Sequence, residues 1–166
     1  MSENEASTGP EPGRLAGAPD ATDRAIIAEL VADGRISVRA LAERIHISRA
    51  NAYARIGRMV EDGTISGFTT RLNPQRVGLG TTAYVTVTIQ QNAWRAVGER
   101  LREIPYIEHL ALVGGDYDVL ALVRTPDNTV LRDVVLEQIQ SIPNVRSTRT
   151  WLVFEEAPGR GAVWEA

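Results

Sequence analysis

Residues 23–73 read DRAIIAELVADGRISVRALAERIHISRANAYARIGRMVEDGTISGFTTRLN, and this stretch decides the fold of the first half of the chain. Apolar residues recur at spacings of three and four in three short runs, which predicts three amphipathic helices. The first helix ends at Asp33-Gly34, the second begins after a capping Ser37, and the third begins after a capping Ser48. Two helices joined by a short turn are typical of a module that places its second helix in the major groove of DNA.

The third predicted helix carries the polar side chains that are able to contact DNA. Its inward face is expected to consist of five residues at helical spacing: Ala52, Tyr53, Ile56, Met59 and Val60. Asn51, Arg55 and Arg58 lie roughly opposite that face. Asparagine and arginine pair with adenine and guanine edges, so Asn51 and Arg55 are candidate base contacts, and Arg58 suits a phosphate. The alternative is a solvated, arginine-bearing helix in an unrelated bundle.

A short alternating segment follows the third helix. Apolar and polar residues alternate around Gly67 from Thr64 to Leu72, and this segment is expected to form a short wing or linking strand. Together with the three helices it predicts a winged helix-turn-helix over residues 21–72. The preceding residues 1–20 are rich in Gly, Pro, Ala, Ser and Glu without periodicity and are expected to be a disordered tail.

Charge is unevenly distributed along the chain. The net charge is −3, but residues 1–20 carry −3, residues 21–72 carry +2 and residues 73–166 carry −2. The acidic average therefore hides a basic segment where DNA contact is expected. All 18 basic residues are arginine, which offers a fixed fork for phosphates and guanine edges; genomic base composition is the alternative explanation.

Composition excludes several classes of protein. With no cysteine and only two histidines, the chain offers no disulfide, thiolate site or histidine-based zinc site, and we expect no metal and no cofactor. No apolar run approaches the ~18 residues of a membrane span. The N-terminus lacks the basic start and apolar centre of a signal peptide. We expect a soluble cytoplasmic protein.

The hydrophobic period changes to two after a turn-rich linker at residues 73–80. Thr81–Gln90 alternates and is rich in threonine and valine, as strands are. Further elements are expected in the order helix, strand, strand, helix, strand, at residues 94–104, 107–113, 117–125, 128–142 and 145–154. This βαββαβ order predicts an α+β, ferredoxin-like domain over residues 81–156, followed by a loose tail at 157–166.

Aromatic side chains of the second domain are expected to be buried or at an interface. In the helix at 94–104, one face is predicted to contain Trp94, Val97, Leu101 and Ile104. Trp94 and Trp151 could stack on a ligand, but on helix and strand faces they more often belong to a core or an interface.

The sequence resembles the leucine-responsive regulator/AsnC family, also called feast/famine regulators, over roughly residues 21 to 156. In the first half the matching residues are Asp23, Asp33 to Ser37, Leu41-Ala42, Ile47-Ser48, Arg55-Ile56, Arg58-Met59, Glu61, Gly63, Ile65 and Gly67-Phe68. In the second half they are Gly115 to Asp118, Ile142 to Val145 and Thr148 to Thr150. Any one piece is weak, whereas the joint pattern across both halves is specific.

This resemblance implies a winged helix-turn-helix and a C-terminal RAM-type domain that regulates transcription in response to amino acids. The recognition helix would run from Ser48 to Arg58, with double-stranded DNA contacted by Ser48, Arg49, Asn51, Arg55 and Arg58. The effector pocket would lie between dimers beside Gly114, Gly115, Asp116, Tyr117 and Asp118, with a contribution from Trp151, Leu152 and Val153. Family members form dimers that often associate into tetramers or octamers.

The glycine-aspartate turn has chemistry that suits an amino-acid ligand. Successive backbone N–H groups of a glycine turn can receive a carboxylate. Asp116 or Asp118 could hold an ammonium group. The alternative is that Gly114-Gly115-Asp116 only closes a tight hairpin.

Two positions depart from the family pattern. His46 stands where the family usually has glycine, so either the histidine adopts the left-handed conformation at some cost or the turn differs slightly. His46 could also meet a phosphate, although an ordinary turn residue is expected. Asn51 replaces the commoner threonine, so a relative's base preference is not expected to transfer.

Two other functions fit the layout less well. Tetrapyrrole decarboxylases of alternative haem synthesis have a similar two-domain arrangement, but no motif for that enzyme is identifiable, and the pair Glu108-His109 has no nucleophile around it. An interaction-only protein that has lost DNA contact is disfavoured by the arginines of the third helix. We therefore expect a DNA-binding regulator and not an enzyme.

Overall fold

The computed structural model describes residues 18–90, 92–157 and 159, and their contacts form two units that divide between Thr70 and Arg71. Each unit has its own hydrophobic core, and we describe each by itself. Among the described residues, none of the helices combines the length and apolar character that crossing a membrane requires.

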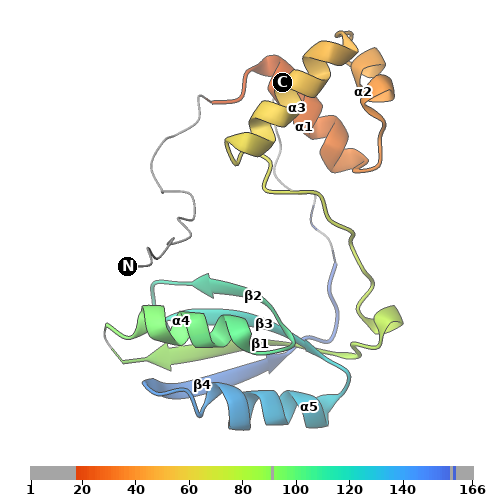
Figure 1. Cartoon of the computed structure of the whole chain (residues 1–166). Coiled ribbons are helices and arrows are strands. Elements are labelled where there is room, and N and C mark those ends of the chain that lie inside the picture. The colour runs from red at the N-terminus through yellow and green to blue at the C-terminus, as the bar shows by residue number, and fades with distance from the viewer. Residues whose placement is uncertain (1–17, 91, 158, 160–166) are drawn as a thin grey trace, which may run out of the picture. The chain divides into compact units, whose positions relative to one another are not determined.

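The N-terminal unit consists of three helices, α1 (Ala21–Ala32), α2 (Val38–Arg44) and α3 (Arg49–Glu61) (Figure 1). Their buried side chains meet in one small core made of Ile26, Leu41, Ala42, Ala52 and Met59. Both predicted serine caps are present. The side chain of Ser37 accepts a hydrogen bond from the Ala40 N–H, and that of Ser48 accepts one from the Asn51 N–H, each at 3.1 Å.

Two predictions for this half were wrong. Tyr53 and Val60, which we assigned to the inward face of α3, are exposed at 65% and 44%. The core of three short helices is too small to cover a stripe that wide, so only Ala52 and Met59 of α3 are fully buried. The strand expected within residues 64–72 is also not observed, since that segment forms no strand and is mostly exposed.

The C-terminal unit contains the predicted βαββαβ order. A 3-10 turn, η1 (Gln75–Val77), precedes β1 (Thr81–Ile89), α4 (Trp94–Glu103), β2 (Ile107–Leu112), β3 (Val119–Thr125), α5 (Asn128–Asp133) and β4 (Val145–Leu152). The second helix is expected to run unbroken to Ile142, but beyond α5 it continues as the π-helical segment η2 (Val134–Ile139). The four strands are antiparallel in the order β2-β3-β1-β4, which confirms the ferredoxin-like α+β fold.

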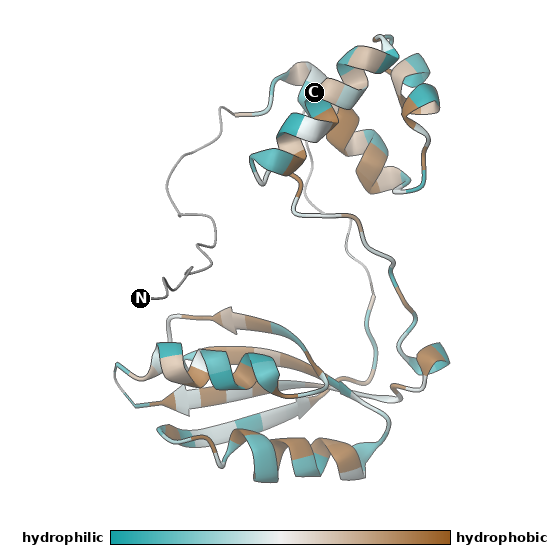
Figure 2. Ribbon diagram, viewed as in Figure 1, coloured by the Kyte–Doolittle hydropathy of each residue, from teal (hydrophilic) through white to brown (hydrophobic). Residues whose placement is uncertain are grey.

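One face of the sheet is covered by helices and holds the core. Alternate residues of β1 and β3 point to that face, and the helices contribute apolar stripes: Ala83, Val85, Val87, Val119, Ala121, Val123, Val97, Leu101, Leu131, Val134 and Ile139. Figure 2 shows hydrophilic and hydrophobic residues alternating along α4 and α5, as burial of one stripe requires. Trp94 is an exception, because it was assigned to the inward face and is 46% exposed at the first turn of α4.

Replacing Leu101 of α4 with alanine tests this core. Leu101 is fully buried, so Leu101→Ala should lower the free energy of unfolding of the C-terminal unit by about 2–5 kcal/mol. Leu136→Ala removes the same atoms from a half-exposed position and should cost less than about 1 kcal/mol. Urea denaturation followed by circular dichroism measures both. Equal losses would contradict the described packing of α4.

Candidate DNA interface and effector turn

A buried carboxylate joins the first turn of α1 to α3, the helix predicted to contact DNA. The side chain of Asp23 is only 3% exposed, yet it lies between two arginines of α3. Arg55 Nη1 donates to one carboxylate oxygen at 2.9 Å, and Arg58 Nη2 donates to the other at 2.5 Å. Two of the predicted DNA contacts are therefore already paired within the chain.

Asp20 adds a second, exposed carboxylate to the same cluster. It caps α1 by accepting from the Asp23 N–H at 2.8 Å, while the Asp20 N–H donates to the Asp23 carboxylate at 3.2 Å. Its other oxygen accepts from Arg55 Nη1 at 2.7 Å, and Arg55 Nε donates to Asn51 Oδ1 at 3.1 Å. The structure thus gathers Asn51, Arg55 and Arg58 around two acids.

These groups line an open hollow of about 460 Å³ between the start of α1 and α3. Its lining consists of Ala18, Asp20, Asp23, Asn51, Ala54, Arg55 and Arg58. Asp20 was expected from the sequence to belong to a disordered tail over residues 1–20, whereas the structure places it at the cap of α1 and in this lining. The available signal was the spacing Asp20-x-x-Asp23 before an apolar run, which is a reciprocal helix cap. A cap motif shows where a helix starts but not that its free oxygens face another helix.

The acids and arginines of this cluster stabilise each other's charged forms. The backbone N–H of Asp23 and the Arg55 guanidinium lower the pKa of Asp20. Burial alone raises the pKa of Asp23, but hydrogen bonds from Arg58 and Arg55 outweigh burial and leave that pKa below its ordinary value. The pKa of Arg55 is raised by Asp20 and Asp23, and that of Arg58 by Asp23.

The other predicted contacts of α3 lie apart from the acids. Ser48 caps the helix, and Arg49 in its first turn is exposed without an ion pair among the described residues. Tyr53, one turn after Arg49, is exposed beside it and was missed, because helical spacing alone does not distinguish the edge of a core from a contact surface. Its ring offers apolar contact to a thymine methyl or a sugar.

The turn between α2 and α3 contains a residue in the left-handed conformation. His46 has φ of 57°, so it adopts the left-handed conformation, as one of the two alternatives predicted. The chain then continues directly into the Ser48 cap, with the Ile47 N–H bonded to the Ala42 carbonyl at 3.0 Å. His46 therefore takes, at this turn, a backbone conformation that glycine adopts at lower cost.

The predicted effector turn lies at one end of the sheet. Asp118 is hydrogen-bonded to the end of β1. Its N–H donates to the Val87 carbonyl at 3.0 Å, and its Oδ2 accepts from the Ile89 N–H at 2.8 Å. Asp116 and both glycines are exposed. A hollow of about 320 Å³ opens next to the turn, lined by Ile89, Gln90, Asn92, Trp94, Leu112, Val113 and Asp118.

The other predicted effector residues lie at the opposite end of β1. Leu152 pairs with Ala83, and the Val153 N–H donates to the Thr82 carbonyl at 2.9 Å. Thr82 and Val87 are five residues apart on β1, which corresponds to roughly 16 Å along a strand. Within one chain, the structure therefore does not bring Trp151, Leu152 and Val153 together with the Gly114–Asp118 turn.

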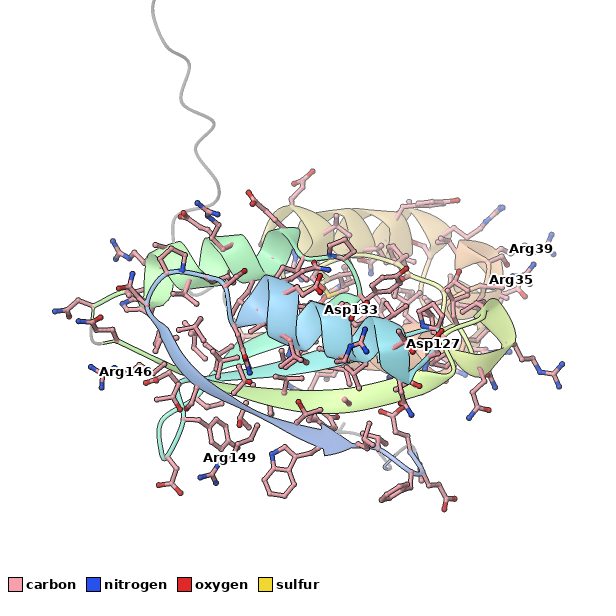
Figure 3. All side chains as sticks on the ribbon, turned by 90° about the horizontal axis from the view of Figure 1, so that it is seen from below. Arg35, Arg39, Asp127, Asp133, Arg146 and Arg149 are labelled. Atoms are coloured by element: carbon pink, nitrogen blue, oxygen red, sulfur yellow. The ribbon has the colours of Figure 1, made fainter. Side chains whose placement is uncertain are left out.

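The face of the sheet opposite the helices is open. Trp151 pairs with Tyr84 and is 60% exposed, so it is not a core residue. Arg149 pairs with Thr86 on the same face, and Figure 3 shows Arg149 on the side of the sheet away from α5. Over residues 18–90, 92–157 and 159, no cluster of three or more His, Asp or Glu side chains is arranged to hold a metal ion.

Comparison with known proteins relates both units to characterised domains. Residues 19–66 match the winged helix-turn-helix DNA-binding family, and residues 82–163 match the Lrp/AsnC ligand binding domain. The proline dehydrogenase transcriptional activator of Rhodobacter capsulatus is 36% identical over 139 residues, which cover 82% of this chain and 90% of the relative. The leucine-responsive regulatory protein of Escherichia coli K12 is 33% identical over 140 residues, covering 82% and 85%.

A solved structure extends the comparison to three dimensions. The feast or famine regulatory protein from M. tuberculosis, complexed with L-methionine, is 30% identical, with a TM-score of 0.80 and coverage of 88% of this chain and 99% of that chain. Fold and sequence together define a DNA-binding transcriptional regulator with a ligand-binding domain. The chain belongs to the Lrp/AsnC family, which confirms the resemblance seen in the sequence.

Removing the buried carboxylate should make the N-terminal unit less sensitive to acid. Since the pKa of Asp23 lies below its ordinary value of 3.8, its stabilisation is present at neutral pH and is lost as the pH falls through the folded-state pKa. Asp23→Asn should cost about 1–3 kcal/mol at pH 7, and the difference should shrink towards pH 2. Thermal unfolding by circular dichroism measures this.

Glu61→Gln is the matched control, because it removes an exposed carboxylate from α3 and should cost less than about 0.5 kcal/mol. A loss for Asp23→Asn that is the same at pH 7 and pH 2 would show that folding does not lower the pKa of Asp23 and would contradict its pairing with Arg55 and Arg58.

Proposed function

We propose that this protein regulates transcription by binding specific DNA sites through α3, and that a small amino-acid effector bound at its C-terminal domain changes that binding. The observation that carries the proposal is the exposed polar surface of α3, which presents Arg49, Asn51, Arg55 and Arg58 on one short helix. The similarity to transcriptional regulators over four fifths of the chain supports the same conclusion.

The residues of α3 proposed to contact DNA lie on two flanks of the helix. Arg49 and Tyr53 lie on one flank, and Asn51, Arg55 and Arg58 lie on the other, with the small Ala54 between them. Small side chains in the middle of an exposed helix face allow its backbone to approach base edges closely. Ser48 is exposed at the start of α3, where it is placed to contact a phosphate, since helix N-termini favour anions.

The effector would bind beside the Gly114–Asp118 turn. Asp118 uses Oδ2 to bind the Ile89 N–H, and its second oxygen faces no hydrogen-bond donor among the described residues, so it suits an ammonium group. The adjoining hollow includes Trp94 and Leu112, which offer apolar contact to a side chain. The related M. tuberculosis protein was solved with L-methionine, which supports an amino acid as the ligand class.

The open sheet face supports a dimer. Tyr84 and Trp151 are adjacent on this face and leave large aromatic surfaces in contact with solvent in a single chain. Pairing two such faces would bury these rings, and further association of dimers would join the two ends of the sheet. We infer a homodimer that assembles further into tetramers or octamers.

We propose that the protein acts in the cytoplasm, because a transcriptional regulator must reach the chromosome. A tetrapyrrole-binding enzyme is the alternative of similar layout. Absorbance shifts on adding sirohaem, without any binding to selected DNA, would support that alternative and contradict the regulator.

Binding to DNA should depend strongly on α3 arginines and on salt. Arg49→Ala and Arg55→Ala should each weaken binding to a duplex selected from a random pool by about 5- to 100-fold. The affinity of the wild type should fall steeply between 50 and 200 mM salt, since several phosphates are neutralised. Fluorescence anisotropy measures both.

Arg132→Ala is the control, because it removes an equally charged side chain that is paired with Asp133 on α5. It should change affinity by less than twofold. If Arg49→Ala and Arg55→Ala bind as tightly as Arg132→Ala, α3 is not the recognition helix.

An amino acid should bind near Asp118 and alter DNA affinity. We expect at least one of the standard amino acids to change the affinity for the selected duplex by about 5- to 150-fold, the usual range of coupling. Asp118→Asn should weaken binding of that amino acid at least tenfold in calorimetry. Asp127→Asn, which retains the cap of α5, should not. Equal behaviour of the two variants would place the effector elsewhere.

A further inference from the structure

The pairing of Arg55 limits which DNA groups it is able to contact. A guanidinium has five N–H donors: one on Nε and two on each terminal nitrogen. Nε donates to Asn51, and Nη1 donates to both Asp20 and Asp23. Among the described residues, only the two N–H groups of Nη2 have no acceptor.

Bidentate contact with guanine needs two N–H groups from different nitrogens on the same edge of the guanidinium. Each edge of Arg55 combines Nη2 with either Nε or Nη1, and both of these are occupied. As folded, Arg55 therefore offers a single nitrogen. One nitrogen suits a phosphate oxygen, which accepts from a single donor without reading the base sequence.

We propose that Arg55 binds the phosphate backbone rather than a guanine edge. Asp20 is the positioning residue that orients the Arg55 guanidinium and weakens its contact with the phosphate. This inference rests on the proposed function, since it requires α3 to meet DNA. It changes the role expected of Arg55 from the sequence and gives Asp20 a role in DNA binding.

Asp20, and not Asp23, is suited to adjust binding. Asp23 is buried and ties α3 to α1, so its loss disturbs the fold. The Asp20 side chain is 55% exposed beside the 26% exposed Arg55, where an approaching phosphate would meet its negative charge. Asp20 both competes for the Arg55 donors and repels the phosphate, so the helix binds DNA with less effective positive charge than its sequence offers.

The salt dependence of DNA affinity measures this reduction in effective positive charge. Each phosphate neutralised by the protein releases DNA counterions and contributes about 0.9 to the slope of log K against log salt concentration. When a phosphate binds Nη2 of Arg55, the neighbouring Asp20 carboxylate retains a cation and cancels part of that release. Without the Asp20 charge, the slope should steepen by up to about 0.9.

The experiment compares full-length wild type with Asp20→Asn and Asp33→Asn. Asparagine caps helices as well as aspartate does, so Asp20→Asn retains the cap of α1 and removes the charge. Asp33→Asn removes an exposed charge at the other end of α1, where the carboxylate accepts only from the Arg35 N–H in the described structure. Affinity is measured against the selected duplex and each of its single-base-pair variants, over a range of salt.

We expect Asp20→Asn to bind every duplex about three to ten times more tightly with a steeper salt slope. Discrimination among base pairs should change by less than twofold. Asp33→Asn should change affinity by less than twofold. In an Arg55→Ala background, Asp20→Asn should gain nothing, because the paired guanidinium is gone, and Arg55→Ala itself should weaken all duplexes about equally.

Other results would overturn the inference. Loss of discrimination at one base pair in Arg55→Ala would show that Arg55 reads a base. If Asp20→Asn binds the selected duplex no more tightly than Asp33→Asn does, Asp20 is only a helix cap. If Asp20→Asn unfolds, Asp20→Ser is the second variant. Its serine side chain still caps α1 but is too short to reach Arg55, so it should give the same increase in DNA affinity. If the wild type selects no duplex, the proposed function fails first, whatever Asp20 does.

Discussion

The carboxylate of Asp23 is the constraint on which the N-terminal unit depends. It is almost fully buried between α1 and α3, where an unpaired charge would be costly, and two arginines of α3 compensate it. A core of five buried apolar residues is small for three helices, so this ion pair also fixes how α3 lies against α1. In the proposed mode of DNA binding, the same interaction decides which donors of α3 remain for DNA. Stability and recognition are therefore coupled through one side chain.

The fold followed largely from the sequence because its patterns are local. The serines at the starts of α2 and α3 cap as expected, and alternation in Thr81–Gln90 located a central strand to within one residue. Errors came where a decision depended on the size of a core. Tyr53 has helical spacing like Met59, but the N-terminal core ends before it reaches Tyr53. The segment after α3 alternates like a strand, but no partner strand is described beside it.

The candidate site was less predictable, for a physical reason. Residue types on α3 indicated DNA, whereas the pairing of Arg55 and Arg58 depends on a contact between residues more than thirty positions apart in sequence. Spacing does not determine such contacts. Likewise, the Gly114–Asp118 turn and the Trp151–Val153 segment share a proposed role but lie at opposite ends of β1, which only the strand register reveals.

That separation along β1 has a consequence for how a cell would use such a protein. A pocket that needs both ends of the sheet must take one end from each of two chains, so it exists only in assembled molecules. Its occupancy then depends on the abundance of the protein as well as on the level of the metabolite. If the proposed pocket is built in this way, the response to the effector depends on the concentration of the protein itself.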